Sequence, residues 1–181
     1  MSEWAEYFNR KVKYEAEAYK KMDYSSMNSC KSRINTVIRL IKDIAIDRNV
    51  QTLILDAGCG IGLFLNIFQE IRFDKVIGVD ISLNAIKVAK KYVNYELILS
   101  NITYLPFKNN MFDIIICIEV IQYIDNINLY RTFAEFNRIL KDNGSLILST
   151  LNANRIFAKS KKVIRRTKEE VVRICNMYGF R

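Results

Sequence analysis

The stretch Leu53-Ile-Leu-Asp-Ala-Gly-Cys-Gly-Ile-Gly62 constrains the fold more than any other part of this chain. An apolar run that ends in an acid is typical of a buried parallel strand. Glycines at positions 58, 60 and 62 follow at once, which indicates a sharp backbone turn with close packing against it. Residues 61–68 have a helical pattern, so the first N–H groups of that helix would point into the turn. The segment therefore predicts a strand, a glycine-rich turn and a helix in succession.

A second strand-like run, Lys75-Val-Ile-Gly-Val-Asp80, also ends in an acid. Asp80 lies 22 positions after Gly58. This spacing is typical of a carboxylate at the tip of the neighbouring strand that binds the two hydroxyls of a ribose. The turn and Asp80 together predict a ribose-containing ligand at the carboxyl ends of these two strands.

Strand and helix patterns alternate along the rest of the chain. Strands are expected at residues 52–56, 75–80, 96–100, 112–118 and 145–150, and helices at 32–46, 61–71, 82–92 and 128–140. Ser82 is the expected N-cap of its helix. Thr167-Lys-Glu-Glu170 resembles a capping box that begins a last helix, which Gly179 ends. The alternation predicts an α/β fold, a mostly parallel sheet with helices on both faces and the strands 52–56 and 112–118 at its centre.

These motifs resemble those of the class I S-adenosylmethionine-dependent methyltransferases, and most closely the branch of the ubiquinone and menaquinone biosynthesis methyltransferases. The family pattern acid-x-Gly-x-Gly-x-Gly stands here as Asp56-Ala-Gly58-Cys-Gly60-Ile-Gly62. The resemblance spans residues 34–150 and continues through the segments 78–82, 105–107, 112–123 and 138–145. It implies a Rossmann-like fold, S-adenosylmethionine as the cofactor, and methyl transfer to a small-molecule acceptor by direct in-line displacement.

The resemblance assigns the glycine turn and both strand-end acids to the cofactor. Main-chain amides around Gly58, Cys59 and Gly60 would hold the methionyl part, and a side chain at these glycines would block its approach. Asp56 would contact the amino group directly or through water. The two oxygens of Asp80 would accept from the ribose hydroxyls. Cys59 is either a packing residue of the turn or a thiol whose pKa the helix start lowers, and we expect the packing role.

Five further residues complete the expected site. Ile81 would lie against the adenine ring. Asn101 and Ile102 follow the strand 96–100, where the family usually has an acid that accepts from the adenine amino group, and Asn101 still offers a carbonyl oxygen. Glu119 lies beside the sulfonium position and either favours the cationic donor or caps backbone amides. Tyr123 stands where relatives commonly carry a histidine, and it either lines the acceptor pocket or covers the core.

The composition of the chain limits the catalytic residues and binding sites that it can contain. The chain has 181 residues and 50% hydrophobic content, which suit one folded domain. It contains no histidine, so the commonest proton shuttle is absent, and Glu119 and Tyr123 are the catalytic candidates should an acceptor need a base. The four cysteines are far apart in the sequence, which predicts no metal site and thiols in a reducing cytoplasm. No apolar run is long enough for a membrane span, and the first residues do not resemble a signal peptide.

Two regions flank the expected core motifs. Residues 1–47 are predicted to form a helical lid segment over the cofactor mouth, in which Trp4, Phe8 and Tyr19 stand among charged residues. Residues 48–181 are predicted to form the cofactor-binding domain. Relatives usually continue past the strand 145–150 into an antiparallel hairpin that this sequence lacks. The edge of that strand would then be bare, a liability that proteins normally cover. We expect the N-terminal segment or a partner chain, such as a second copy in a homodimer, to cover it.

Three alternatives stay open on the sequence. A nicotinamide-dependent oxidoreductase would need a glycine at position 63, where Leu63 stands. The formal net charge of +9 and the basic segment 151–168 are compatible with RNA or a protein as the acceptor, although we do not favour nucleic acid. DNA amino-methyltransferases are excluded, because the segment Ile118-Glu-Val-Ile121 replaces their Asn/Asp-Pro-Pro-aromatic run. A non-catalytic cofactor-binding subunit is the third alternative.

Overall fold

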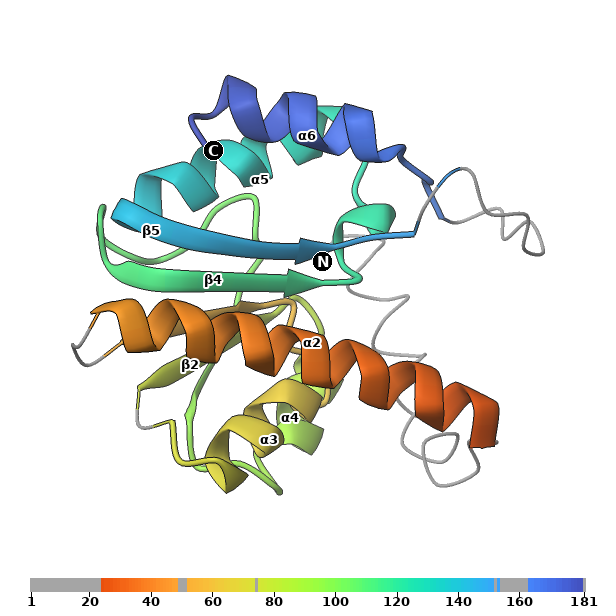
Figure 1. Ribbon diagram of the computed structural model, residues 1–181, viewed down its shortest axis with the longest axis vertical. Helices are drawn as coiled ribbons and strands as arrows, with labels where there is room; N and C mark the ends of the chain where they lie inside the picture. Colours follow the sequence, from red (N-terminus) through yellow and green to blue (C-terminus); the bar gives the residue numbers. More distant parts are fainter. Residues whose placement is uncertain (1–23, 49–51, 74, 152, 154–162, 181) are drawn as a thin grey trace.

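A computed structural model describes residues 24–48, 52–73, 75–151, 153 and 163–180, with side chains of the first helix described over 32–44. Within these residues the chain forms one parallel sheet of order β3-β2-β1-β4-β5 (Figure 1). The strands are β1 (Ile54–Ala57), β2 (Val76–Asp80), β3 (Glu96–Leu99), β4 (Phe112–Ile118) and β5 (Leu140–Ser149). All four strand pairs are parallel. The order reverses between β1 and β4, as the sequence predicts.

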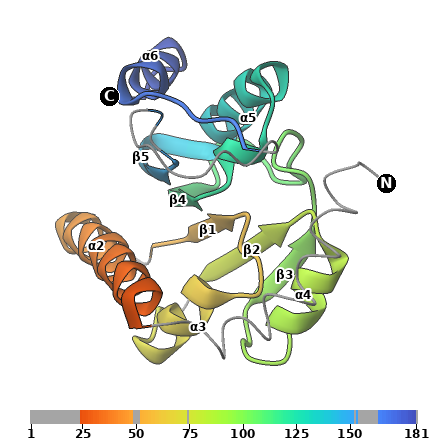
Figure 2. The same ribbon diagram turned by 90° about the vertical axis from the view of Figure 1, so that its right-hand side faces the viewer.

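Helices cover both faces of this sheet (Figure 2). The helices are α2 (Tyr24–Arg48), α3 (Leu63–Glu70), α4 (Leu83–Ala89), α5 (Asn126–Ile139) and α6 (Lys168–Met177), with a 3-10 turn η1 (Ile121–Tyr123) after β4. The first three lie on one face of the sheet, and α5 and α6 lie on the other. Among the described residues, no helix has both the length and the apolarity needed to cross a bilayer.

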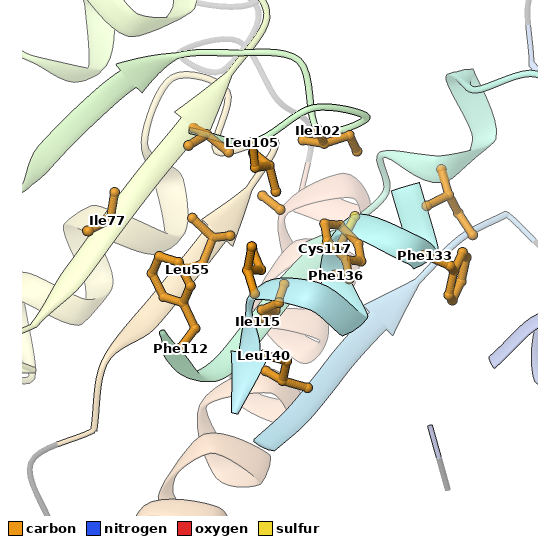
Figure 3. Close-up of a cluster of buried hydrophobic side chains, with 14 of the residues drawn as sticks. Leu55, Ile77, Ile102, Leu105, Phe112, Ile115, Cys117, Phe133, Phe136 and Leu140 are labelled. Atoms are coloured by element: carbon orange, nitrogen blue, oxygen red, sulfur yellow. The ribbon is translucent and has the colours of Figure 1, made fainter. Parts of the chain in front are cut away.

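The central strands are buried on both faces, which explains their continuous apolar runs. Along β1, Ile54 packs with Val37 and Ile41 of α2, whereas Leu55 packs with residues of α5, because successive side chains point to opposite faces. Figure 3 shows the α5 side of this core, where Phe136 of α5 lies near Cys117 of β4 and Phe112 lies near Leu55 of β1. The sheet is therefore a rigid support for residues at its carboxyl edge.

Local capping signals place most helix ends correctly. Ser82 Oγ accepts from Ala85 N at 3.1 Å, and Thr167 Oγ1 accepts from Glu170 N at 3.1 Å, so both predicted N-caps are confirmed. The helix expected from residue 128 begins at Asn126, because Asp125 is its N-cap and accepts from Asn128 N at 2.8 Å. The strand expected from residue 145 begins at Leu140, with Asn143 in a left-handed conformation inside it.

The predicted N-terminal lid segment is described only from residue 24 onward, so Trp4, Phe8 and Tyr19 lie outside the described residues. Its described part, α2, contributes the buried side chains Val37 and Ile41 to the core between the helices and the sheet. The helix predicted over residues 32–46 is confirmed and longer than expected. The described part of the segment thus belongs to the packed core. Its role as a lid stays a prediction.

Candidate cofactor and acceptor site

The carboxyl ends of β1, β2 and β4 bring three acidic residues to one edge of the sheet. Asp56 lies in β1, Asp80 ends β2, and Glu119 follows β4 directly. These strands are neighbours in a parallel sheet, with β1 between the other two, so their carboxyl ends lie at the same edge. This is the edge at which open α/β sheets bind ligands, next to the point where the strand order reverses.

The turn after β1 is fixed by hydrogen bonds to β2. The amides of Gly58 and Cys59 both donate to Val79 O, at 2.8 and 2.9 Å, and the amide of Gly60 donates to Asp80 Oδ2 at 2.8 Å. All three amides therefore donate within the protein, and their contact with the methionyl part stays a prediction. A ligand would contact this turn through main-chain carbonyls or share the existing donors.

Gly58 and Gly60, two of the three glycines of the turn, serve different purposes. Both have left-handed backbones, with φ of 88° at Gly58 and 55° at Gly60, a conformation that favours glycine. A Cβ on Gly58 would collide with the side chain of Val120, so that glycine is needed for packing within the protein. A Cβ on Gly60 would meet no atom of the described residues within 4 Å. The prediction of an open approach to the turn therefore applies to Gly60.

Asp80 holds two loops at the end of β2. Its Oδ2 accepts from Gly60 N, and its Oδ1 accepts from Ser82 N, both at 2.8 Å. The carboxylate therefore ties the glycine turn to the start of α4. A carboxylate has about four acceptor positions, so holding these amides is compatible with accepting from a ribose hydroxyl.

Asp56 is the buried acid of this edge. It is 2% exposed, and its buried Oδ2 has no hydrogen-bond partner among the residues that the structure describes. Burial raises the pKa of Asp56 to about 8, and the negative charge of Asp80 adds to the shift. Asp56 is therefore mostly protonated at neutral pH. A cation brought close to it would stabilise its ionised form.

Cys59 is a packing residue. Its side chain is buried, with contacts in the core on the α3 side of the sheet. Burial, together with the charges of Asp56 and Asp80, raises the pKa of its thiol well above the usual value. The alternative of a thiol activated by the helix start is therefore wrong, because desolvation outweighs any effect of the helix on the thiolate.

Glu119 binds an arginine that sequence reasoning missed. Arg33 of α2 lies 2.9 Å from Glu119 Oε1, and each side chain is 36% exposed. Glu119 has a left-handed φ of 57°, a strained conformation for this residue type that is common at functional sites. Arg33, Val37 and Ile41 follow one another at helical spacing, so the face of α2 that enters the core also carries Arg33 to the strand ends. Glu119 thus pairs with a side chain of α2. Neither of its two predicted roles, favouring the cationic donor or capping backbone amides, includes this contact.

The other predicted site residues lie around the same edge with different exposure. Ile81 and Tyr123 are half-buried, Asn101 is exposed, and Ile102 is buried in the core on the α5 side. Asn101 Oδ1 accepts from Thr103 N at 3.0 Å, so the oxygen proposed for adenine already stabilises its own turn. The buried side chain of Ile102 leaves its main chain as the part that a ligand could contact.

The basic segment after β5 contributes one buried arginine. Arg166 is 1% exposed, and its guanidinium donates to Ile121 O at 2.8 Å and to Ile124 O at 2.7 Å. These carbonyls belong to η1 and the residue after it, so Arg166 fastens the start of α6 to the turn that carries Tyr123. Arg166 is therefore not part of a basic surface for nucleic acid, although its residue type alone suggested that use. Residues 154–162 of the segment lie outside the described part of the chain.

Comparison with known proteins identifies a family profile for a methyltransferase domain, which matches residues 55–148. An uncharacterised protein of Methanocaldococcus jannaschii is 38% identical over 105 residues, which are 58% of this chain and 43% of that protein. A malonyl-[acyl-carrier protein] O-methyltransferase of Hamiltonella defensa is 31% identical over 99 residues, 54% of this chain and 37% of that protein. The chain thus spans about half the length, or less, of these curated relatives.

A solved structure with similar architecture is that of magnesium protoporphyrin IX methyltransferase from Synechocystis with bound SAH. It superposes with a TM-score of 0.73 at 17% identity, over 97% of this chain and 87% of that chain. At this identity the likeness concerns the fold alone. It agrees with the strand order and the two helical layers described above.

Proposed function

Because the chain belongs to the methyltransferase-domain family, we propose that it binds S-adenosylmethionine at the carboxyl ends of β1, β2 and β4 and transfers its methyl group to a small molecule. The family match covers residues 55–148, which include β2, β4 and all of β1 except its first residue. The observation that carries the proposal is the space over Gly60 that no described residue fills, next to the carboxylate of Asp80. A small-molecule acceptor is supported by relatives named as ubiquinone biosynthesis O-methyltransferases, such as that of Dictyostelium discoideum, which is 28% identical over 114 residues.

The residues at the edge fit this cofactor in charge and hydrogen bonding. Asp80 would hold the ribose hydroxyls, the main chain at Gly60 would face the methionyl part, and the unpartnered Oδ2 of Asp56 would receive the amino group directly or through water. When bound, S-adenosylmethionine supplies a methyl group on a cationic sulfonium, an electrophile that needs alignment with the acceptor more than it needs acid–base chemistry. The absence of histidine from the chain is compatible with such a reaction.

The acceptor side is formed by residues after β4. Glu119 and Tyr123 flank η1, and Arg33 sets the position of the Glu119 carboxylate from α2. A negative charge at Glu119 would favour a cationic donor in its vicinity, whereas Arg33 reduces that charge. Tyr123 would line the acceptor pocket. The roles of Glu119 and Tyr123 are those that the sequence suggests. The role of Arg33 comes from its contact with Glu119 in the structure.

Replacing Asp80 by alanine tests the cofactor site. We expect Asp80→Ala to weaken the binding of S-adenosylmethionine by at least about tenfold, because hydrogen bonds to a charged acceptor are lost. Titration calorimetry measures the affinity, and circular dichroism verifies that the fold persists. Asp142→Ala, which removes an exposed carboxylate of β5, is the control and should bind as the wild type does.

An isosteric variant separates ribose binding from the support of the turn. Asp80→Asn keeps one of the two oxygens that accept from Gly60 N and Ser82 N. We therefore expect its affinity for S-adenosylmethionine to lie between that of the wild type and that of Asp80→Ala. Unchanged affinity in both Asp80 variants would refute the ribose role.

A further inference from the structure

Two segments that carry the family resemblance, residues 105–107 and 138–145, have no part in the proposed function. The structure joins them through two charged side chains of α5. Glu135 and Arg138 both reach the chain that connects β3 to β4. This connection also contains Asn101, which is predicted to contact adenine. Contacts that fix the connection therefore bear on the adenine end of the proposed site.

Glu135 and Arg138 form an ion pair that we call the α5 clasp. The Nε and Nη2 atoms of Arg138 donate to the two carboxylate oxygens of Glu135, at 2.9 and 2.8 Å. Such a fork-to-fork pair fixes the orientation of both groups. The side chain of Glu135 is 16% exposed and that of Arg138 is 32% exposed. Their pairing lowers the pKa of Glu135 and raises the pKa of Arg138, so both are charged at neutral pH.

The α5 clasp holds the main chain of the connection at Leu105 and Phe107. The amide of Leu105 donates to Glu135 Oε2 at 2.8 Å, and its carbonyl accepts from Arg138 Nη2 at 3.1 Å. Arg138 Nη1 donates to Phe107 O at 2.8 Å and to Asn109 Oδ1 at 2.9 Å. Hydrogen bonds to charged groups are stronger than those between neutral groups. The clasp thus fixes a stretch of chain that belongs to neither a helix nor a strand.

The turn before Leu105 is held at both of its ends. At its start, Ser100 N donates to Asp80 O at 3.0 Å, which continues the pairing of β3 with β2. At its end, Leu105 is bound by the α5 clasp. Ile102 and Leu105 are also buried in the core on the α5 side (Figure 3). The main chain of residues 101–104 therefore has little freedom to shift.

This turn lies where the base of the proposed ligand would lie. The base, the ribose and the methionyl part follow one another in S-adenosylmethionine. With the ribose at Asp80 of β2 and the methionyl part at Gly60 after β1, the base would lie toward β3, the other neighbour of β2. Asn101 and Ile102 stand just after β3. Because the side chain of Ile102 is buried, its main chain is the part that can contact the base.

We propose that Glu135 and Arg138 are positioning residues for adenine, which hold the turn 101–104 in its binding shape before the cofactor arrives. The inference rests on the proposed function, because it assigns the base to this turn. Both side chains would act through Leu105 and not by contact with the ligand. A turn that is ordered on folding loses no freedom on binding, so this arrangement strengthens the contact with adenine. An ion pair with a merely structural role would not affect which base is bound.

The test compares S-adenosylhomocysteine with S-inosylhomocysteine, in which hypoxanthine replaces adenine. We expect the wild type to prefer the adenine compound, and Glu135→Gln and Arg138→Gln each to reduce this preference by about threefold or more. Titration calorimetry measures both affinities, and circular dichroism verifies the fold. Lys141→Gln is the matched control, because Lys141 pairs with the part-buried Asp113 at 2.9 Å near the start of β4 and β5. It should leave the preference unchanged.

A further measurement needs only the ligand-free wild-type chain. The amide of Leu105 should be protected from hydrogen exchange by about 100-fold or more relative to an unstructured amide, because Glu135 accepts from it without any ligand. Exchange at the unstructured rate would overturn the inference. So would an unchanged preference in both clasp variants, or an equal change in Lys141→Gln.

The wild-type titrations separate this inference from the proposed function. Binding of both compounds with equal affinity would overturn the positioning of adenine and leave the cofactor site in place. A wild-type chain that binds neither compound would contradict the proposed function, and the inference with it.

Discussion

An Asp56→Asn chain is expected to be more stable than the wild type at alkaline pH, by several kcal/mol near pH 9. Burial raises the pKa of Asp56 from 3.8 to about 8. Between these values the unfolded chain has released its proton and the folded chain has kept it, so wild-type stability falls as the pH rises from about 4 to about 8. Asparagine carries no titrating proton and removes this loss. Urea unfolding of both chains at about pH 5 and pH 9 measures the difference.

The pH dependence of the difference is what identifies the cause. Near pH 5 the pH has passed the pKa of the unfolded chain by only about one unit, so the two chains should differ there much less than near pH 9. Asp142→Asn changes an exposed aspartate of β5 and is the control; its stability relative to the wild type should not depend on pH in this range. A constant gain for Asp56→Asn at both pH values would contradict a buried, protonated Asp56.

The same carboxyl group links cofactor binding to protons. If Asp56 receives the amino group of S-adenosylmethionine, the cation lowers the pKa of Asp56 and a proton is released on binding at neutral pH. Affinity in the wild type should therefore rise with pH up to about 8, and Asp56→Asn should lose that rise. Calorimetric titrations in buffers of different ionisation enthalpy measure the released proton directly.

A Gly60→Val chain is expected to lose detectable binding of S-adenosylmethionine, by at least about 100-fold, or ~3 kcal/mol. The Cβ of residue 60 would point into a space where the described part of the chain has no atom within 4 Å. A branched side chain would therefore occupy the approach to the turn. Valine at a left-handed φ of 55° also strains the backbone, so the effect on binding must be separated from an effect on folding.

Gly179→Val is the matched control for that variant. Gly179 also has a left-handed φ, of 80°, and its Cβ would likewise meet no atom within 4 Å. It follows α6, away from the carboxyl edge of the sheet, so its replacement should cost similar stability and leave cofactor affinity unchanged. Retained affinity in Gly60→Val, or equal loss in both variants, would contradict an open cofactor approach over Gly60.

Features that depend on neighbouring residues could be predicted from the sequence. The central strands can be predicted because burial on both faces gives them continuous apolar runs. The N-caps Ser82 and Thr167 can be predicted because an N-cap depends only on the three residues that follow it. The N-cap Asp125 carries the same local signal, but the helix was expected to begin later. Strand β5 was expected to begin only after the turn at Asn143, whereas the structure continues the strand through it.

Features that depend on how distant elements meet could not be predicted. Arg33 reaches Glu119 only because Val37 and Ile41 fix the position of α2 on the sheet. Arg166 lies 45 positions from Ile121, whose carbonyl it binds. The amides of the glycine turn were expected to face the cofactor, but the end of β2 lies close enough to accept from them. In each case the residue type indicated that the residue forms a polar contact, but the sequence did not indicate which partner it contacts.

The most direct test of the proposed cofactor site is a calorimetric titration of the wild-type chain with S-adenosylhomocysteine, the demethylated product. We predict saturable binding with one ligand per chain, weakened in Asp80→Ala and lost in Gly60→Val. No binding by the folded wild-type chain, or binding that both variants retain, would contradict the assignment of the carboxyl edge of β1 and β2 to this cofactor.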